Sequence, residues 1–265
     1  VDSSYLLNLA LKRGRAAIFF SATLTPLEYH RELLGGNKGD YHIKLSSPFP
    51  KENLCLFVND HISTRYKDRE KTYINIVESI ETFTNSKKGN YFIFFPSYVY
   101  MKNIYEMLIE RNPSKNIVMQ ESPMTEIQRE EFLSRFNYED DLIAFAVMGG
   151  IFSEGIDLVG EKLIGAVIVG VGMPQICFER DIIKDYFNHN NENGFDYAYV
   201  FPGMNKVLQA AGRVIRSEED RGAILLIDDR YGTLRYKDLF PNEWTHFKRV
   251  LGKANMEKIL EDFWN

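Results

Sequence analysis

The sequence predicts an α/β protein with a mostly parallel sheet flanked by helices. Three observations support this. Short apolar runs rich in Ile, Val and Phe end in Gly, Pro or Asp, as buried strands do. Amphipathic stretches with helical spacing separate these runs. Across the 265 residues there is no internal repeat and no linker long enough to divide the chain. Regular alternation of strands and helices is typical of a parallel sheet covered on both faces.

The expected strands are five to seven residues long. They cover residues 16–20, 91–95, 142–147, 163–169 and 223–227. In such sheets the loops at the carboxyl ends of the strands hold the ligand. The residues that directly follow each run are therefore the candidates for ligand binding or catalysis.

The expected helices cover residues 70–83, 99–109 and 125–136, where apolar residues recur every three or four positions. Before the third helix, Ser122 is predicted as the cap and Pro123 as the first helical residue. The tail from 244 to 264 also has a helical pattern and is expected to pack on the core.

Composition excludes several classes of protein. The chain is 45% hydrophobic and 14% aromatic, which argues against disorder, and its formal charge of −5 argues against a generic nucleic-acid coat protein. Two cysteines cannot form a disulfide framework or a four-thiolate metal site, so we expect a reducing, cytoplasmic setting. No apolar run approaches the roughly 20 residues that span a bilayer, so we expect no membrane partner.

The segment 209–216 carries the most information. On a continuous helix Gln209, Gly212, Arg213 and Arg216 would share one face. Guanidinium groups suit phosphate oxygens because they are planar, permanently charged and multidentate. A solvated basic helix face explains the pattern about equally well. However, residues 205–237 carry seven basic and five acidic side chains, a net charge of +2, which leaves −7 for the rest. This division favours a focused phosphate site.

A glycine-rich segment follows the expected strand 142–147. Its glycines allow a tight loop whose N–H groups can face an anion. In the same segment Glu154 and Asp157 could hold a cation, a ribose hydroxyl or a partner arginine. Taken alone, an ordinary glycine turn is the better explanation.

Two hydroxyl-bearing turns also follow expected strands. Ser21 and Thr23 lie after residues 16–20, and Ser97 and Tyr98 lie after residues 91–95. Such positions suit nucleic-acid phosphates, although helix capping alone explains them. Tyr98, Tyr100 and Phe152 are candidate stacking residues, each more readily explained as a core or rim aromatic.

Four segments, taken in order, resemble motifs three to six of superfamily 2 helicases, and most closely the DinG/XPD-type branch. They are Ser-Ala-Thr at 21–23, Phe-Pro-Ser-Tyr at 95–98, Ser-Glu-Gly-Ile-Asp-Leu at 153–158 and Gln-Ala-Ala-Gly-Arg-Val-Ile-Arg at 209–216. Arg-Gly at 221–222, followed by a strand ending in Asp-Asp-Arg-Tyr at 228–231, is also similar. The resemblance covers roughly residues 15–240, and the order of four motifs makes chance an unlikely explanation.

The resemblance implies a RecA-like motor domain of an ATP-driven, mostly 5′-to-3′ DNA helicase, with ATP and Mg²⁺ bound at the interface with a first RecA-like domain. It implies that Arg216 is the arginine finger and that Arg213 and Gln209 assist at the nucleotide.

The remaining roles follow the same motifs. Glu154, Gly155 and Asp157 would lie where the nucleotide and strand-binding regions meet. Ser97, Tyr98 and Ser153 would contact single-stranded or forked DNA. Ser21 and Thr23 would couple the two domains.

Departures from the family pattern are equally specific. The chain has no Gly-x-x-x-x-Gly-Lys-[Ser/Thr] motif and no Asp-Glu pair. It opens on Val1 rather than Met. We therefore predict the second motor half of a longer protein, a RecA-like domain without its own P-loop and unable to hydrolyse ATP alone. Residues 1–26 would form the hinge strand and its Ser-Ala-Thr segment, and residues 27–265 the domain itself. No metal site is expected in this chain. An iron–sulfur cluster is expected, if at all, only in the first motor half of the longer protein.

Two alternatives stay open. One is a non-catalytic module that binds DNA or a protein partner on a helicase-like fold. The other, less favoured, is a different doubly wound enzyme such as a nucleotide-sugar transferase, which gives no reason for arginines at 213 and 216.

Overall fold

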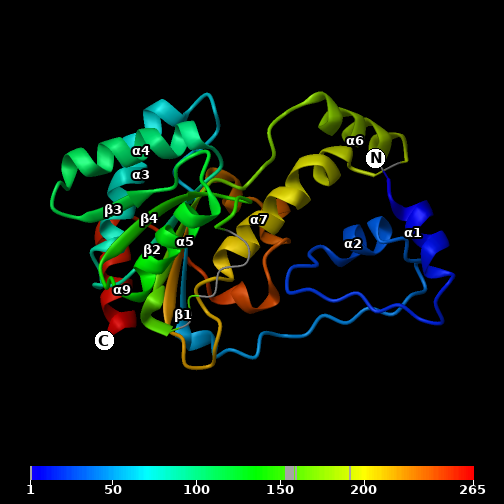
Figure 1. Ribbon diagram of the computed structural model, residues 1–265, viewed down its shortest axis with the longest axis horizontal. Helices are drawn as coiled ribbons and strands as arrows, with labels where there is room; N and C mark the ends of the chain where they lie inside the picture. Colours follow the sequence, from blue (N-terminus) through cyan, green and yellow to red (C-terminus); the bar gives the residue numbers. More distant parts are fainter. Residues whose placement is uncertain (1, 153–157, 159, 191) are drawn as a thin grey trace.

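The structure is a computed structural model that describes residues 2–152, 158, 160–190 and 192–265. Its centre is a parallel sheet with the strand order β3-β4-β2-β5-β6-β1-β7 (Figure 1). The strands are β1 (Leu54–Asn59), β2 (Tyr91–Phe95), β3 (Asn116–Met119), β4 (Leu142–Val147), β5 (Gly165–Val169), β6 (Gly222–Ile227) and β7 (Lys248–Arg249). Each paired strand runs parallel to its neighbour, which confirms the predicted fold class.

Helices cover both faces of the sheet (Figure 1). One face packs against α3 (Arg69–Thr84), α4 (Tyr98–Arg111) and α9 (Lys253–Trp264). The other packs against α5 (Glu126–Ser134), α7 (Phe201–Ala211) and α8 (Leu234–Lys237). Successive residues of a strand alternate between these layers: Phe57 joins the first core and Val58 the second, and both are fully buried.

Most predicted elements are confirmed, with small shifts at their ends. Strands 91–95 and 142–147 match β2 and β4, and the helices expected at 70–83 and 99–109 match α3 and α4. The last helix is shorter than the tail predicted to be helical, and Met256 and Leu260 bury it against the core. The strands β1, β3 and β7 were not predicted, and β7 lies within the tail predicted to be helical.

The strand predicted at residues 16–20 is wrong for this chain. These residues form no strand, and Ile18 and Phe20 are 86% and 90% exposed. An apolar run becomes a strand only when a neighbouring strand supplies the hydrogen-bonding ladder, and the described sheet does not reach this segment.

The third helix begins within one residue of the predicted 125, but the cap predicted at Ser122 and Pro123 is wrong. Thr125 caps α5, accepting a hydrogen bond from the N–H of Gln128, while the Gln128 side chain accepts one from the N–H of Thr125 at 2.8 Å. This reciprocal capping satisfies two helix N–H groups and sets the helix start after Pro123.

The N-terminal helices lie away from the sheet, beside α6 (Phe178–His189) (Figure 1). They are α1 (Ser4–Leu11) and α2 (Leu27–Leu33). The hydroxyl of Tyr186 on α6 donates to Asp2 at 2.7 Å, and the ring of Tyr29 on α2 lies 5.2 Å from that of Tyr197 and 5.0 Å from that of Phe201. Tyr197 belongs to a π-helix (Asp196–Val200) that runs into α7. Aromatic contacts thus join this N-terminal arm to the start of α7.

Candidate functional site

The carboxyl ends of β2 and β4 meet at one edge of the sheet, where Ser97 and Tyr98 lie. The Ser97 hydroxyl accepts a hydrogen bond from the N–H of Tyr100 and caps α4. The Tyr98 hydroxyl accepts one from the Gln120 amide at 2.7 Å, and the Gln120 oxygen accepts one from the N–H of Val147 at 2.9 Å. Tyr98 is 38% exposed, so part of this residue reaches solvent at this edge.

The other two stacking candidates are core residues. Tyr100 is 1% exposed and Phe152 is fully buried, with its ring 4.6 Å from that of Phe132. Neither can stack on a nucleic-acid base without unfolding its surroundings, so the core explanation is confirmed.

Ser153, Glu154, Gly155 and Asp157 lie outside the described residues, and the predictions made for them stay predictions. Leu158, the described residue just after Asp157, is buried in the core below the sheet edge.

The segment of the two arginines departs from the predicted geometry. The helix α7 ends at Ala211, so Arg213 and Arg216 lie beyond it and do not extend one helical face. Buried Val214 explains the break, because its side chain lies over the start of β6, where a Cβ on Gly222 would meet it at 2.3 Å. Both arginines are half-buried, and Gln209 lies in the last turn of α7.

Asp220 holds this connection in place, and the sequence analysis missed it. Its carboxylate, 5% exposed, accepts hydrogen bonds from the N–H of Arg216 at 2.7 Å and of Ser217 at 2.8 Å. It also accepts from the Ser217 hydroxyl at 2.8 Å and from the N–H of Gly160 at 3.1 Å. Burial raises the pKa of this carboxyl, but the hydrogen bonds outweigh burial and hold it below its usual value. The spacing of Ser217 and Asp220 is typical of a side-chain-stabilised turn and was the available signal.

A second buried carboxylate closes the end of β6. Asp228 is fully buried and accepts from Arg230 through Nε at 2.6 Å and Nη2 at 2.8 Å, and from the Thr64 hydroxyl. Burial raises the pKa of Asp228, but the hydrogen bonds and charge of Arg230 outweigh burial and hold the pKa below its usual value. The Tyr231 hydroxyl donates to the Gly170 carbonyl at 2.8 Å, joining the ends of β6 and β5. The Asp-Asp-Arg-Tyr segment therefore braces the sheet edge.

Ser21 and Thr23 lie near α7 rather than in the sheet. Their hydroxyl oxygens are 3.4 Å apart, and the N–H of Thr23 donates to Ser21 Oγ at 3.2 Å. In the orientation that satisfies its amide, Asn205 of α7 donates to the carbonyls of Thr23 at 3.1 Å and Thr25 at 3.0 Å. The Ser-Ala-Thr segment thus contacts the helix that carries Gln209.

Within the residues that the structure describes, no group of three or more His, Cys, Asp or Glu side chains could hold a metal ion. In the same part of the chain, no helix is long and apolar enough to cross a membrane.

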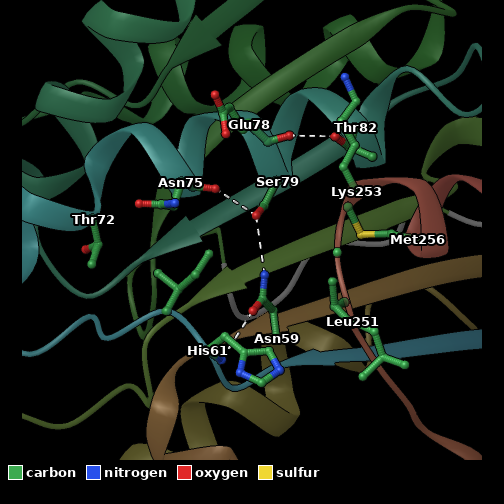
Figure 2. Close-up of a pocket in the computed structure, with 13 residues that line it drawn as sticks. Asn59, His61, Thr72, Asn75, Glu78, Ser79, Thr82, Leu251, Lys253 and Met256 are labelled. Atoms are coloured by element: carbon green, nitrogen blue, oxygen red, sulfur yellow. Dashed lines mark hydrogen bonds between the residues drawn. The ribbon is translucent and has the colours of Figure 1, made fainter.

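A cavity of about 390 Å³ lies between α3 and the start of α9 (Figure 2). Polar side chains of α3 face it: Ser79 Oγ donates to the carbonyl of Asn75 and Thr82 Oγ1 to that of Glu78, both at 2.7 Å. The amide of Asn59, at the end of β1, donates to Ser79 Oγ at 3.4 Å. None of the residues predicted from the sequence motifs lines this cavity.

With this geometry described, comparison with known proteins identifies the class. Residues 80–247, more than half of the chain, match the family model described as Helicase C-terminal domain, and the chain belongs to this family. The predicted DinG/XPD resemblance is confirmed by individual relatives.

The chain is 29% identical over 95% of its length to a protein of Methanocaldococcus jannaschii named "Probable ATP-dependent helicase". It is 25% identical over 92% of its length to the ATP-dependent DNA helicase DinG of Photobacterium profundum. It covers 41% and 36% of those two proteins, well under half of either. A solved XPD helicase superposes on 93% of this chain with a TM-score of 0.72 at 21% identity, covering 45% of that structure, which shows a RecA-like helicase fold.

Proposed function

We propose that this chain is the second motor domain of an ATP-dependent DNA helicase and that Arg216 is its arginine finger. The observation that carries the proposal is the clamp on Arg216. Asp220 accepts hydrogen bonds from the backbone of Arg216 and Ser217 and from Gly160, so the loop that bears the arginine is fixed from both sides. A backbone held in this way limits the reorganisation that the arginine side chain needs before it can stabilise charge on a transferred phosphoryl group.

The other predicted residues support the nucleotide in this proposal. Gln209 lies in the last turn of the helix that leads into the arginine loop, and Arg213 lies near the start of that loop. Both would contact ATP, bound with Mg²⁺ against the first RecA-like domain of the same polypeptide. Ser21 and Thr23 would couple closure of the two RecA-like domains to α7, whose Asn205 contacts this segment.

The carboxyl edge near Tyr98 would contact single-stranded DNA, with unwinding in the 5′-to-3′ direction. Contacts to the backbone and one exposed ring suit a motor that must tolerate any sequence. Unwinding of partial duplexes with a 5′ or a 3′ tail tests the direction, and preference for the 3′ tail would contradict it.

The test of the finger uses the complete polypeptide with Arg216→Ala. DNA-stimulated ATPase activity should fall by about 10³–10⁵-fold, as removal of an arginine finger does. The matched control is Arg111→Ala at the end of α4, where the arginine pairs with Glu81 at 2.9 Å. Arg111→Ala should retain wild-type activity. A kcat for Arg216→Ala close to that of the control would refute the assignment.

A further inference from the structure

A second cationic feature lies on α7, one helical turn before Gln209. The side chain of Lys206 lies across the backbone of Gly149, just after β4. A Cβ on Gly149 would come within 2.8 Å of Lys206 Cδ and Cε. Gly149 has a φ of +69°, so glycine both permits the turn and leaves room for the lysine. A Cβ on Gly172, after β5, would lie 3.4 Å from Lys206 Cβ. Lys206 is therefore placed at the carboxyl ends of β4 and β5.

Lys206 has no acidic partner in the part of the chain that the structure describes, and its Nζ makes no hydrogen bond there. Arg180 of α6 is held against the π-helix that runs into α7, because its Nη1 donates to the Ala198 carbonyl at 3.2 Å, and its positive charge acts on Lys206. Burial and the positive charge of Arg180 lower the pKa of Lys206. By contrast Lys184, one turn along α6, pairs with Asp181 at 2.9 Å.

Two half-buried cations with no carboxylate partner among the described residues cost folding free energy, because burial removes solvent and like charges repel. An anion placed between them would remove that cost. Lysine offers a compact charge and arginine a planar fork, and both suit phosphate oxygens. The surface lies at the carboxyl edge of a parallel sheet, where ligands of such sheets bind.

We propose that Lys206 and Arg180 form a binding site for a phosphate group, in addition to the arginine finger. The proposal rests on the proposed function, which supplies two sources of phosphate: the backbone of single-stranded DNA and the bound nucleotide. A purely structural role for Lys206, in which its methylenes cover Gly149, predicts that an uncharged side chain of similar length works equally well.

The experiment compares Lys206→Met, Lys206→Arg and the control Lys184→Met in the complete polypeptide. Binding of a fluorescent oligo-dT strand is measured by anisotropy at several salt concentrations, and the KM for ATP is measured with saturating DNA. If the phosphate belongs to DNA, Lys206→Met should weaken binding about tenfold and reduce the salt slope by about 0.7–1. If it belongs to the nucleotide, the KM for ATP should rise about tenfold while DNA binding stays unchanged.

Lys206→Arg, which keeps the charge, should restore the affected constant, and Lys184→Met should match wild type. The inference is overturned if Lys206→Met matches wild type in both assays, or if Lys206→Arg is as defective as Lys206→Met. If the wild-type polypeptide showed neither DNA binding nor DNA-stimulated ATPase activity, the proposed function itself would fail. That result is distinct from failure of the phosphate site alone.

Discussion

Replacing Arg230 by methionine should be among the most destabilising single changes outside the apolar core. Asp228 is fully buried, and Arg230, with 17% of its side chain exposed, is its charge partner. Methionine keeps most of the arginine's length and apolar contact but removes its charge and its Nε and Nη2 hydrogen bonds. A buried carboxylate then remains without a countercharge.

Removing one partner of a buried ion pair costs about 3–5 kcal/mol. The Thr64 hydroxyl and the N–H of Arg230, which donates to Asp228 at 2.8 Å, remain as donors, so we expect the lower half of this range. For a domain of this size 1 kcal/mol corresponds to roughly 2–4 °C, so the melting temperature should fall by roughly 6–16 °C.

The assay is thermal and urea unfolding of the chain, followed by circular dichroism. The matched control is Arg111→Met, which breaks an ion pair whose arginine is 41% exposed and should cost at most about 1 kcal/mol. The double variant Asp228→Asn/Arg230→Met should be more stable than Arg230→Met, because it leaves no buried charge. If Arg230→Met were no more destabilising than Arg111→Met, the assignment of a buried, charge-dependent brace would be refuted.

Three further predictions follow from the geometry. Acid should destabilise the fold, because Asp220 and Asp228 have folded pKa values below their unfolded value: the stability they contribute is present above about pH 4 and is lost as pH falls through the lowered folded pKa. The free energy of unfolding, measured from pH 7 to pH 3, checks this, and an Asp220→Asn/Asp228→Asn variant that loses as much stability as wild type would contradict it. A thiol reagent at pH 8 should modify exposed Cys177 rapidly and Cys55 only after denaturation, because burial raises the pKa of Cys55 to about 11. Equal rates of modification of the two thiols in the native protein, measured by mass spectrometry, would be inconsistent with this. Thr125→Ala should cost about 1 kcal/mol by removing the cap of α5, whereas Thr125→Ser should be close to neutral in urea unfolding.

Sequence patterns predicted β2, β4, β5 and β6, which are buried on both faces, but missed β1, although it is also apolar and buried. The runs that became β2 and β4 are continuously apolar, which only a covered parallel strand tolerates. β3 was missed because it is a half-buried edge strand of four residues and shows no such run. The run at residues 16–20 has the same apolar character but no strand to pair with here. An apolar run therefore indicates that a segment can be buried, whereas a neighbouring strand that supplies backbone hydrogen bonds decides whether the segment forms a strand.

The motifs determined the family from the identity and order of a few side chains, because the chemistry of phosphate recognition constrains residue types directly. Only the tertiary structure decided how those side chains are held. The helix ends before the two arginines because Val214 is buried in the core, against the start of β6. Asp220 fixes that segment through Gly160, 60 residues away in sequence, and the charge of Arg180 acts on Lys206 from another helix. Such pairings depend on which strands and helices become neighbours in space, and a local sequence pattern does not carry that information.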